Sequence, residues 1–198
     1  MNAVVFDIGN VLVEWDPVAA FLPDLGCRKE TDAFLERTAF HARNQRADAG
    51  ERFGALAQEI PDPDDRMLFS RYPERYALTV QRPIEGTWAI INRLKRNGHP
   101  VHAITNWSAE TWPIGLTLHP RLHEAFGVTI VSGREGLIKP DPAIFDLLCQ
   151  RASLRPDDCL FIDDSPMNVQ GARDAGWQAH HFTTPERLEA DLTERGLL

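Results

Sequence analysis

The sequence predicts an α/β protein: a Rossmann-like, mostly parallel sheet with helices on both faces, plus an inserted α-helical cap. Short apolar runs of strand length alternate with segments of helical periodicity over most of the chain. About 65 residues after the first run carry helical patterning only, which is too long for a simple strand-to-helix connection. The predicted strands are residues 3–6, 100–104, 127–131, 160–162 and 178–182.

The first predicted strand ends on a carboxylate. Ala3 to Phe6 form an apolar, largely β-branched run that is typical of a buried strand, and Asp7 follows directly. The next residues, Gly9 and Asn10, favour a sharp turn with positive φ. An aspartate at the carboxyl end of the first strand of a parallel sheet points into the ligand-binding crevice. Considered alone, Asp7 is better explained as a residue that caps the next turn.

The predicted cap occupies residues 16–80, and the predicted core comprises residues 1–15 and 81–198. We expect the cap to close over a substrate and exclude water, as such lids commonly do. A polar stretch of the cap runs from Arg43 to Asp48 and is expected to contact the substrate, with Arg43 and Arg46 as our candidates for substrate binding. A solvated loop explains that stretch equally well.

The helices predicted for the core begin and end at residues that suit helix termini. The apolar residues of 84–94 have helical spacing, and Asn97-Gly98 provides a good C-terminal signal. Asp141-Pro142 supplies an N-cap and a first-turn proline for another helix. A helix is predicted over residues 168–175, and Pro185 begins the last one. The alternation of these helices with the strands indicates helices on both faces of the sheet.

Composition and charge exclude several classes of partner. The formal net charge is −8, and no Lys/Arg cluster is longer than a pair, so we expect no nucleic-acid partner. No apolar stretch approaches the ~20 residues of a membrane span, so we expect no membrane partner. The first strand begins almost at once and leaves no room for a signal peptide, which favours a cytoplasmic location. We expect a monomer or a homodimer.

The cysteines and two of the histidines do not indicate a metal site. Cys27, Cys149 and Cys159 are odd in number and widely spaced, so we expect buried thiols in a reducing compartment. His119 and His123 have the i, i+4 spacing of metal ligands, but no third ligand lies near them. We therefore expect both histidines at the surface.

Four segments carry matching chemistry. Asp7, Thr105 and the pair Asp163-Asp164 follow predicted strands, whereas Lys139 lies in a loop that opens a helix. Because the carboxyl ends of parallel strands converge, we expect these groups in one crevice. A carboxylate nucleophile, a hydroxyl, an ammonium ion and further carboxylates suit phosphoryl transfer through an aspartyl-phosphate. Oxygen ligands with room for water favour Mg²⁺ as the cofactor.

These segments resemble the four sequence motifs of the haloacid dehalogenase superfamily, in the branch with a helical cap after the first strand. The resemblance covers nearly the whole chain, and the cap is its least specific part. The four motifs together are a strong indication of this superfamily, whereas any one of them alone is a weak one. In chain order the segments are Val5-Phe6-Asp7-Ile8-Gly9-Asn10-Val11-Leu12, Ile104-Thr105-Asn106-Trp107-Ser108, Gly136-Leu137-Ile138-Lys139-Pro140-Asp141-Pro142 and Phe161-Ile162-Asp163-Asp164-Ser165-Pro166-Met167-Asn168.

The resemblance implies a role for each matching residue. Asp7 would be the nucleophile, and Thr105 and Asn106 would contact the phosphoryl oxygens of the substrate. Lys139 would stabilise the negative charge. The Mg²⁺ ligands implied are Asp7, the main-chain carbonyl of Gly9, Asp164 and, in support, Asp163.

One departure from the family pattern leaves the reaction open. Most phosphatases of the superfamily carry a second aspartate, the general acid–base, where this chain has Gly9. The paired acids Asp163-Asp164 favour a Mg²⁺-dependent phosphomonoester hydrolase acting on a small phosphorylated metabolite, with sugar phosphates as one candidate. Without an acid at Gly9, we expect a preference for phosphates with good leaving groups.

Three other functions share features with the predicted phosphatase. The first alternative is a 2-haloacid dehalogenase, because dehalogenases of the superfamily also lack the second aspartate, since a halide leaves without a proton. The second alternative is a weakly active or non-catalytic phosphate-binding protein. A phospho-signalling receiver gathers similar groups, but its acidic pair comes first in the chain and it has no long insertion after the first strand.

Overall fold

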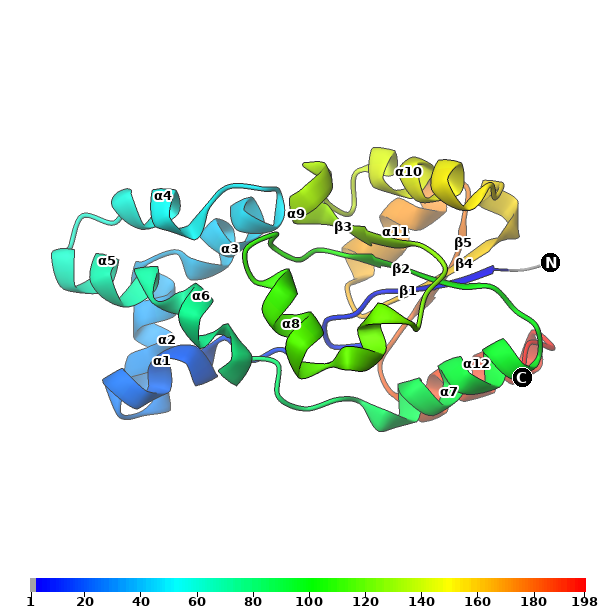
Figure 1. The fold of residues 1–198 in the computed structure, drawn as a ribbon, viewed down its shortest axis with the longest axis horizontal. Coiled ribbons are helices and arrows are strands. Elements are labelled where there is room, and N and C mark those ends of the chain that lie inside the picture. Colours follow the sequence, from blue (N-terminus) through cyan, green and yellow to red (C-terminus); the bar gives the residue numbers. More distant parts are fainter. Residues whose placement is uncertain (1–2) are drawn as a thin grey trace.

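The computed structural model describes residues 3–198 and contains a five-stranded parallel sheet. The strand order is β3-β2-β1-β4-β5, so β1 lies at the centre (Figure 1). All five predicted strands are confirmed, with small differences at their ends. The strands are β1 (Ala3–Phe6), β2 (Val101–Thr105), β3 (Thr129–Val131), β4 (Cys159–Asp163) and β5 (Gln178–His181).

Strand β1 is buried on both faces, which explains its continuous apolar sequence. Val4 pairs with Val101 of β2 on one side and with Leu160 of β4 on the other. Val4 belongs to one hydrophobic cluster, and Val5 belongs to a second cluster on the opposite face of the sheet. The strand therefore places Asp7, which follows it, at the middle of the carboxyl edge.

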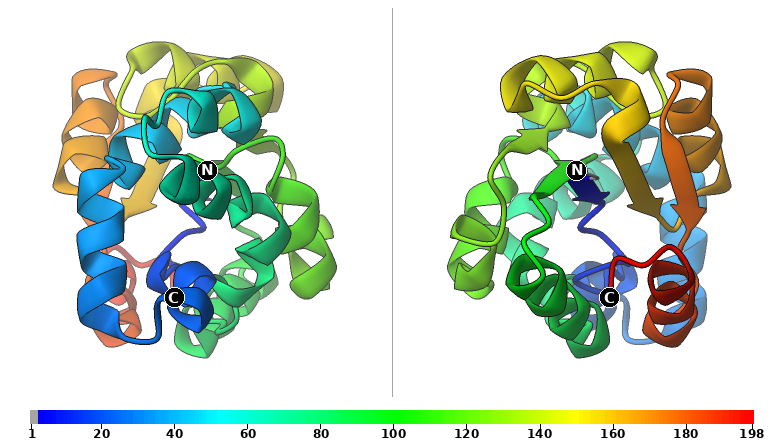
Figure 2. Two further views of the ribbon diagram at one scale, coloured as in Figure 1. Left: turned by 90° about the vertical axis from the view of Figure 1, so that its left-hand side faces the viewer. Right: turned by 90° about the vertical axis from the view of Figure 1, so that its right-hand side faces the viewer.

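Helices cover both faces of the sheet, as the sequence predicts (Figures 1 and 2). One face carries α7 (Glu85–Arg96) and α12 (Pro185–Glu194), and the other carries α10 (Pro142–Ala152) and α11 (Pro166–Asp174). The Asp141 side chain caps α10 by accepting from Ala143 N at 2.9 Å. Helix α11 begins at Pro166, two residues before the predicted start, since Pro suits the first helical turn.

Between β1 and α7 the chain forms a bundle of short helices that we call the helical insertion (left side of Figure 1). Its two connections to the sheet run side by side: Glu14 N donates to Arg82 O, and Asp16 N donates to Thr79 O, each at 2.9 Å. The insertion consists of α1 (Val18–Leu25), α2 (Arg28–Arg37), α3 (Phe40–Asp48), α4 (Phe53–Gln58), α5 (Pro63–Ser70), α6 (Tyr72–Arg75) and the 3₁₀ helix η1 (Tyr76–Leu78).

Aromatic packing holds the helical insertion together. The rings of Phe21 and Phe34 lie 4.7 Å apart, and those of Phe40 and Tyr72 lie 4.8 Å apart. These fully buried side chains belong to the same hydrophobic cluster as Val4 on the sheet. The insertion is therefore packed continuously onto the core.

The remaining elements lie between β2 and α10 and just before β4. They are α8 (Trp112–Leu118), η2 (Pro120–His123), α9 (Ser132–Glu135) and η3 (Pro156–Asp158).

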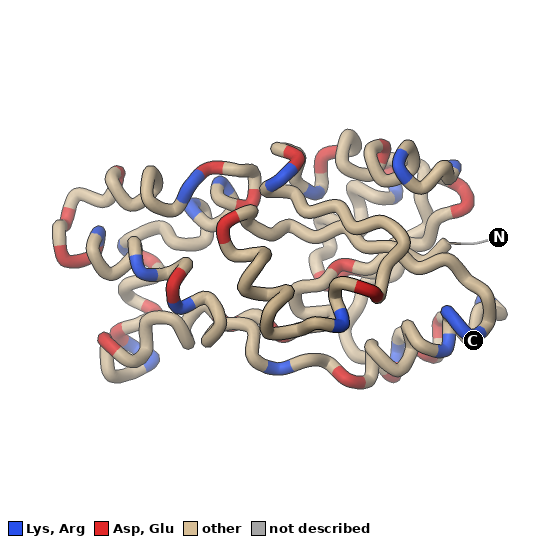
Figure 3. Tube along the Cα trace, in the orientation of Figure 1, with Lys and Arg blue, Asp and Glu red and all other residues tan. Residues whose placement is uncertain are grey.

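Along the outer helices, basic residues lie among acidic ones (Figure 3), and pairs such as Arg151–Glu135 form salt bridges at 2.7 Å. Among residues 3–198, no helix combines the length and the apolar character that crossing a bilayer requires.

Two of the expectations for single side chains are wrong. Cys27 is exposed, while Cys149 and Cys159 are buried as predicted. His119 is buried rather than at the surface, because α8 packs against η1 and brings a His119 ring nitrogen to the carbonyl oxygen of Val80. Neither burial state can be inferred from local sequence, since both depend on which segment packs alongside.

Candidate active site

Three carboxylates meet at the carboxyl edge of the sheet. Asp7 follows β1, Asp163 ends the neighbouring strand β4, and Asp164 comes next. Each offers one oxygen, and these oxygens all lie within 4.8 Å of one another. The adjacency of β1 and β4 thus brings together residues more than 150 positions apart in the sequence.

Lys139 joins two of these carboxylates. Its ammonium nitrogen lies 2.9 Å from Asp7 Oδ1 and 2.7 Å from Asp163 Oδ2, and it also donates to Ile104 O at 3.1 Å. The Lys139 side chain is fully buried. Asn106 holds its main chain by accepting from Lys139 N at 2.9 Å and donating to Lys139 O at 3.1 Å. The Asn106 amide is therefore occupied in positioning Lys139, although the residue also lines the cavity.

Asp163 and Asp164 have different surroundings. Asp163 is fully buried, and its oxygens accept from Ser165 N at 2.8 Å, from Asn168 Nδ2 at 3.0 Å and from Lys139. Asp164 is half-buried and lines the cavity beside Asp7. The geometry therefore gives Asp163 a positioning role and leaves Asp164 available to a ligand.

The electrostatics of the cluster are dominated by burial. Burial raises the pKa of Asp7 to about 7; Lys139 opposes this, whereas Asp163 and Asp164 raise it further. Burial, and secondarily Asp163, also raises the pKa of Asp164. Burial alone would lower the pKa of Lys139, but Asp163 and Asp7 outweigh it and raise that pKa, so the amine stays protonated.

The donor set fits a divalent cation. Three carboxylates and one ammonium ion leave a formal excess of two negative charges when all are ionised. Asp7, Gly9 and Asp164 line one cavity and can offer carboxylate and carbonyl oxygens, the ligands that Mg²⁺ prefers. A cation there would also lower the pKa of Asp7 and keep it ionised.

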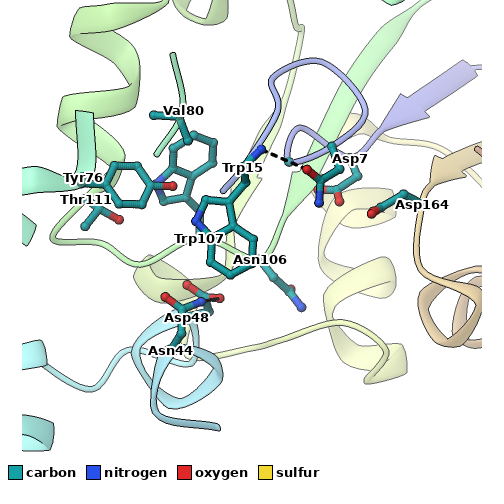
Figure 4. A pocket seen from close by; sticks show the side chains of 12 residues that line it. Asp7, Trp15, Asn44, Asp48, Tyr76, Val80, Asn106, Trp107, Thr111 and Asp164 are labelled. Atoms are coloured by element: carbon teal, nitrogen blue, oxygen red, sulfur yellow. Dashed lines mark hydrogen bonds between the residues drawn. The ribbon is translucent and has the colours of Figure 1, made fainter. Parts of the chain in front are cut away.

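Above the carboxylates lies a cavity of about 190 Å³ with aromatic walls (Figure 4). Trp15, Tyr76 and Trp107 line it together with Val80 and Thr111. The rings of Tyr76 and Trp107 lie 5.5 Å apart, so the helical insertion and the core share this wall.

Two polar side chains of α3 complete the wall opposite Asp7 (Figure 4). Asn44 and Asp48 lie one helical turn apart, and Asn44 Nδ2 donates to Asp48 Oδ2 at 2.9 Å. Burial raises the pKa of Asp48 to about 8; the Ser108 N–H lowers it, and the charge of Asp7 raises it. Burial thus favours the protonated form of Asp48.

Arg43 and Arg46 are not among the residues that line the cavity. Arg46 binds Glu51 and Glu59 on the outer surface, at 2.6 and 2.7 Å. Arg43 donates to Thr38 O and lies 3.6 Å from Glu59. The structure places both arginines away from the cavity, whereas Asn44 and Asp48 of the same helix line it. The side of α3 that faces the cavity depends on how the insertion packs on the core, which local spacing does not encode.

The turn after β1 differs from the expectation at one residue. Asn10 has the left-handed conformation, with φ of 55°, and its Oδ1 accepts from Trp15 N at 2.9 Å (Figure 4). Gly9 does not have positive φ, and a Cβ built there would meet no atom within 4 Å. Position 9 is therefore open to a side chain.

Thr105 ends β2 and is almost fully buried, as predicted for a strand terminus, but it is not among the cavity-lining residues. The structure therefore gathers Asp7, Lys139, Asp163 and Asp164 into one cluster, with Gly9 and Asn106 at the cavity.

Comparison with known proteins agrees with this geometry. The model of the haloacid dehalogenase-like hydrolase family matches residues 1–176. The sesquiterpene phosphatase astK of Aspergillus oryzae is 26% identical over 187 residues, which cover 92% of this chain and 90% of that protein. Other relatives are longer: the matched segments make up 46% of flavin mononucleotide hydrolase 1 from Arabidopsis thaliana and 7% of mouse acyl-CoA dehydrogenase family member 10. The chain thus spans less than half the length of these two relatives.

Solved structures with this fold include both a magnesium- and phosphate-bound enzyme and a dehalogenase. A HAD family enzyme from Bacteroides thetaiotaomicron, in complex with magnesium and inorganic phosphate, aligns with a TM-score of 0.67 at 19% identity, covering 93% of this chain and 95% of that one. The L-2-haloacid dehalogenase of Xanthobacter autotrophicus aligns with a TM-score of 0.67 at 18% identity, covering 98% and 83%. At these identities the likeness establishes the fold.

Proposed function

The chain belongs to the haloacid dehalogenase-like hydrolase family, and from its site we propose that it is a Mg²⁺-dependent phosphomonoester hydrolase. The observation that carries the proposal is the buried Lys139 ammonium ion held between Asp7 and Asp163, with Asp164 at the open side. This arrangement supplies fixed positive charge beside a carboxylate that must meet an anionic substrate. The phosphatase activity of the relative astK supports the same reaction class.

In the proposed mechanism Asp7 attacks the phosphoryl group. Ile8 N at 2.7 Å and Lys139 at 2.9 Å both bind Asp7 Oδ1, which orients the carboxylate and leaves Oδ2 as the nucleophile. A bond forms from Oδ2 to phosphorus, the ester P–O bond breaks, and water later hydrolyses the aspartyl-phosphate. Lys139 stabilises the charge of the transferred group, and we propose that Thr105 and Asn106 support it.

The metal residues of this proposal are Asp7, Asp164 and the carbonyl of Gly9. A bound Mg²⁺ would neutralise phosphoryl oxygens and lower the repulsion between the substrate and Asp7. Asp163 would support the metal site indirectly, because its oxygens accept hydrogen bonds from Lys139, Ser165 N and Asn168.

We propose a small phosphorylated metabolite as substrate. A cavity of about 190 Å³ accommodates a phosphoryl group and only a compact leaving group. The aromatic walls suit the apolar face of a sugar ring, and Asn44 and Asp48 offer partners to hydroxyl groups, so sugar phosphates stay a candidate. The helical insertion, residues 16–80, would act as the cap that closes this cavity.

The direct test is a screen of small phosphorylated metabolites with Mg²⁺ and the purified chain. Release of inorganic phosphate is expected for a subset of substrates, to disappear with chelator, and to return with added Mg²⁺. Phosphate release that chelator does not change would contradict the metal role. Binding of inorganic phosphate without any turnover would instead identify a phosphate-binding protein.

A 2-haloacid dehalogenase is the second candidate, because position 9 carries no acid and a halide leaves without a proton. The buried charge of Lys139 beside Asp7 suits either leaving group. Chelator-resistant release of halide from a 2-haloacid, together with no phosphate release in the screen, would decide for this candidate.

A further inference from the structure

We propose that Asp48 of the helical insertion is a catalytic residue: it gives a proton to the leaving group and later takes one from water. It would replace the acid–base side chain that position 9 lacks. This inference rests on the proposed phosphatase function and deepens it, since it concerns the step in which the ester oxygen departs. Three features of the structure support it: the place of Asp48 in the cavity, its anchoring, and its ionisation state.

Asp48 lies on the wall of the cavity whose floor holds Asp7 (Figure 4). A phosphoryl group placed on Asp7 has its leaving oxygen on the side away from the nucleophile, because the attacking and leaving oxygens are in line. Asp7 comes from the core and Asp48 from the insertion, so the leaving oxygen would enter the space between them. Among the residues that line this cavity, Asp7, Asp48 and Asp164 carry the carboxyl groups, and the first and third are assigned to the nucleophile and the metal.

Asp48 is held in place from both sides. Asn44 Nδ2 donates to Asp48 Oδ2 at 2.9 Å, which fixes the carboxyl group on the cavity wall. Ser132 Oγ of the core donates to the main-chain carbonyl of Asp48 at 2.5 Å. The same Ser132 Oγ accepts from Trp107 N at 3.0 Å. The end of α3 is thus tied to the core directly beside the active-site wall.

The surroundings of Asp48 keep its carboxyl protonated when the substrate arrives. Asp48 is half-buried, and its exposed part faces the cavity. Burial is the main cause of its raised pKa, and the nearby charge of Asp7 adds to it, while the Ser108 N–H and Lys139 oppose the shift. An acid of this kind is matched to donating a proton near neutral pH.

The two half-reactions then balance. In the first, Asp7 Oδ2 bonds to phosphorus, the ester oxygen leaves with the bonding electron pair, and the Asp48 proton passes to it, giving an alcohol and an Asp48 carboxylate. In the second, that carboxylate takes a proton from water, whose oxygen bonds to phosphorus as the bond to Asp7 breaks. Phosphate is released, and Asp48 is protonated again.

Asp48→Asn tests the first half-reaction, because the amide keeps the shape and cannot donate an acidic proton. The measurement is release of the alcohol in a single turnover with Mg²⁺, for an alkyl phosphate and for p-nitrophenyl phosphate. We expect a loss of ~10²–10⁴-fold with the alkyl ester. With p-nitrophenyl phosphate we expect a change of only a few-fold, since that leaving group needs no proton. A burst of p-nitrophenol followed by slow turnover is expected too, because the variant lacks the base for the second half-reaction.

Two further variants sharpen this test. Gly9→Asp added to Asp48→Asn should restore part of the lost alkyl-ester rate, because position 9 has space for a side chain and no positive φ. The matched control is Asp32→Asn, which changes an exposed acid of α2 that lies 3.6 Å from Arg28 and should alter the rate with neither ester. The p-nitrophenyl phosphate rate reports that Asp48→Asn still folds.

The outcomes separate this inference from the proposed function. If the wild-type chain hydrolyses no phosphate ester, the proposed function fails and this inference fails with it. If the wild-type chain is active and Asp48→Asn slows both esters equally, or slows neither, the phosphatase stands and Asp48 is not the proton donor. If Asp48→Asn does not fold, Asp48→Glu and Asn44→Ala take its place, because both alter the position of the carboxyl group at residue 48. An unchanged ratio of the alkyl-ester rate to the p-nitrophenyl phosphate rate in these variants would likewise show that Asp48 is not the proton donor.

Discussion

The floor and the roof of the cavity are built on different principles. The floor is charged: Asp7 and Asp164 line it, and Asp7 binds the buried Lys139, which in turn binds the buried Asp163. The roof is mostly aromatic, with Trp15, Tyr76 and a single acid, Asp48. Strand pairing positions the floor, whereas packing between the insertion and the core positions the roof.

This difference indicates that the floor and the roof have different roles in the proposed reaction. In the proposed phosphatase, the floor would contact the phosphoryl group, which is the same in every phosphomonoester, so its geometry suits any substrate of that class. The roof would contact the leaving group, which differs from one substrate to another. Changes in the floor should therefore abolish activity, while changes in the roof should redistribute it among substrates.

The largest effect is expected from Asp7→Asn, which removes the proposed nucleophile. An amide oxygen does not form the acyl-phosphate, so turnover should fall by roughly 10⁴-fold or more on every substrate. The melting temperature should stay the same or rise, because the substitution removes one of three crowded carboxylates. Phosphate release and thermal unfolding measure the two quantities. Normal turnover in a purified, verified Asp7→Asn preparation would exclude the mechanism.

Lys139→Met should damage both activity and stability. The side chain is completely buried, and without it Asp163 keeps a charge that lacks its ammonium partner. Removing one partner of a buried ion pair typically costs about 3–5 kcal/mol. Denaturant unfolding of Lys139→Met, Asp163→Asn and the double variant measures this cost. We expect the double variant to be less destabilised than the sum of the two single ones, and strict additivity would argue against the pairing.

A smaller, roof-specific effect is expected from Gly115→Ala. A Cβ at this position would lie 2.6 Å from Trp107 Cζ2, so the indole must shift, and Trp107 lines the cavity. Overpacking of this kind typically costs about 1–3 kcal/mol. KM should rise more for bulky substrates than for compact ones, with little change in the rate on the smallest ester. A uniform fall in kcat for all substrates would show that the change reaches the floor.

The smallest effect is expected from changing Arg43 and Arg46 to Ala. Both guanidinium groups bind outside the cavity, so the relative activities among substrates should stay within about twofold. This outcome is the reverse of the one that the sequence favoured. Steady-state kinetics on a panel of substrates measure these relative activities. A changed ranking of substrates would support a substrate-binding role for the two arginines.

The sequence by itself determined the sheet and the floor. Apolar runs of strand length, Asp141 followed by Pro142 at a helix start, and Asp7, Lys139 and Asp163-Asp164 in their order were enough to place the acids and the lysine at one edge. These inferences succeed because strand burial, helix capping and the convergence of parallel strand ends depend on local residue type and topology.

Only the tertiary structure decided the roof and the detailed roles. It selected Asn44 and Asp48 over Arg43 and Arg46, because the face that α3 turns inward depends on how the insertion packs on the core. It also separated Asp163 from Asp164, since Asp163 binds Lys139, which lies 24 residues earlier in the chain, and Asn168 of α11. Such contacts depend on the close approach of distant segments, which a pattern of neighbouring residues does not encode.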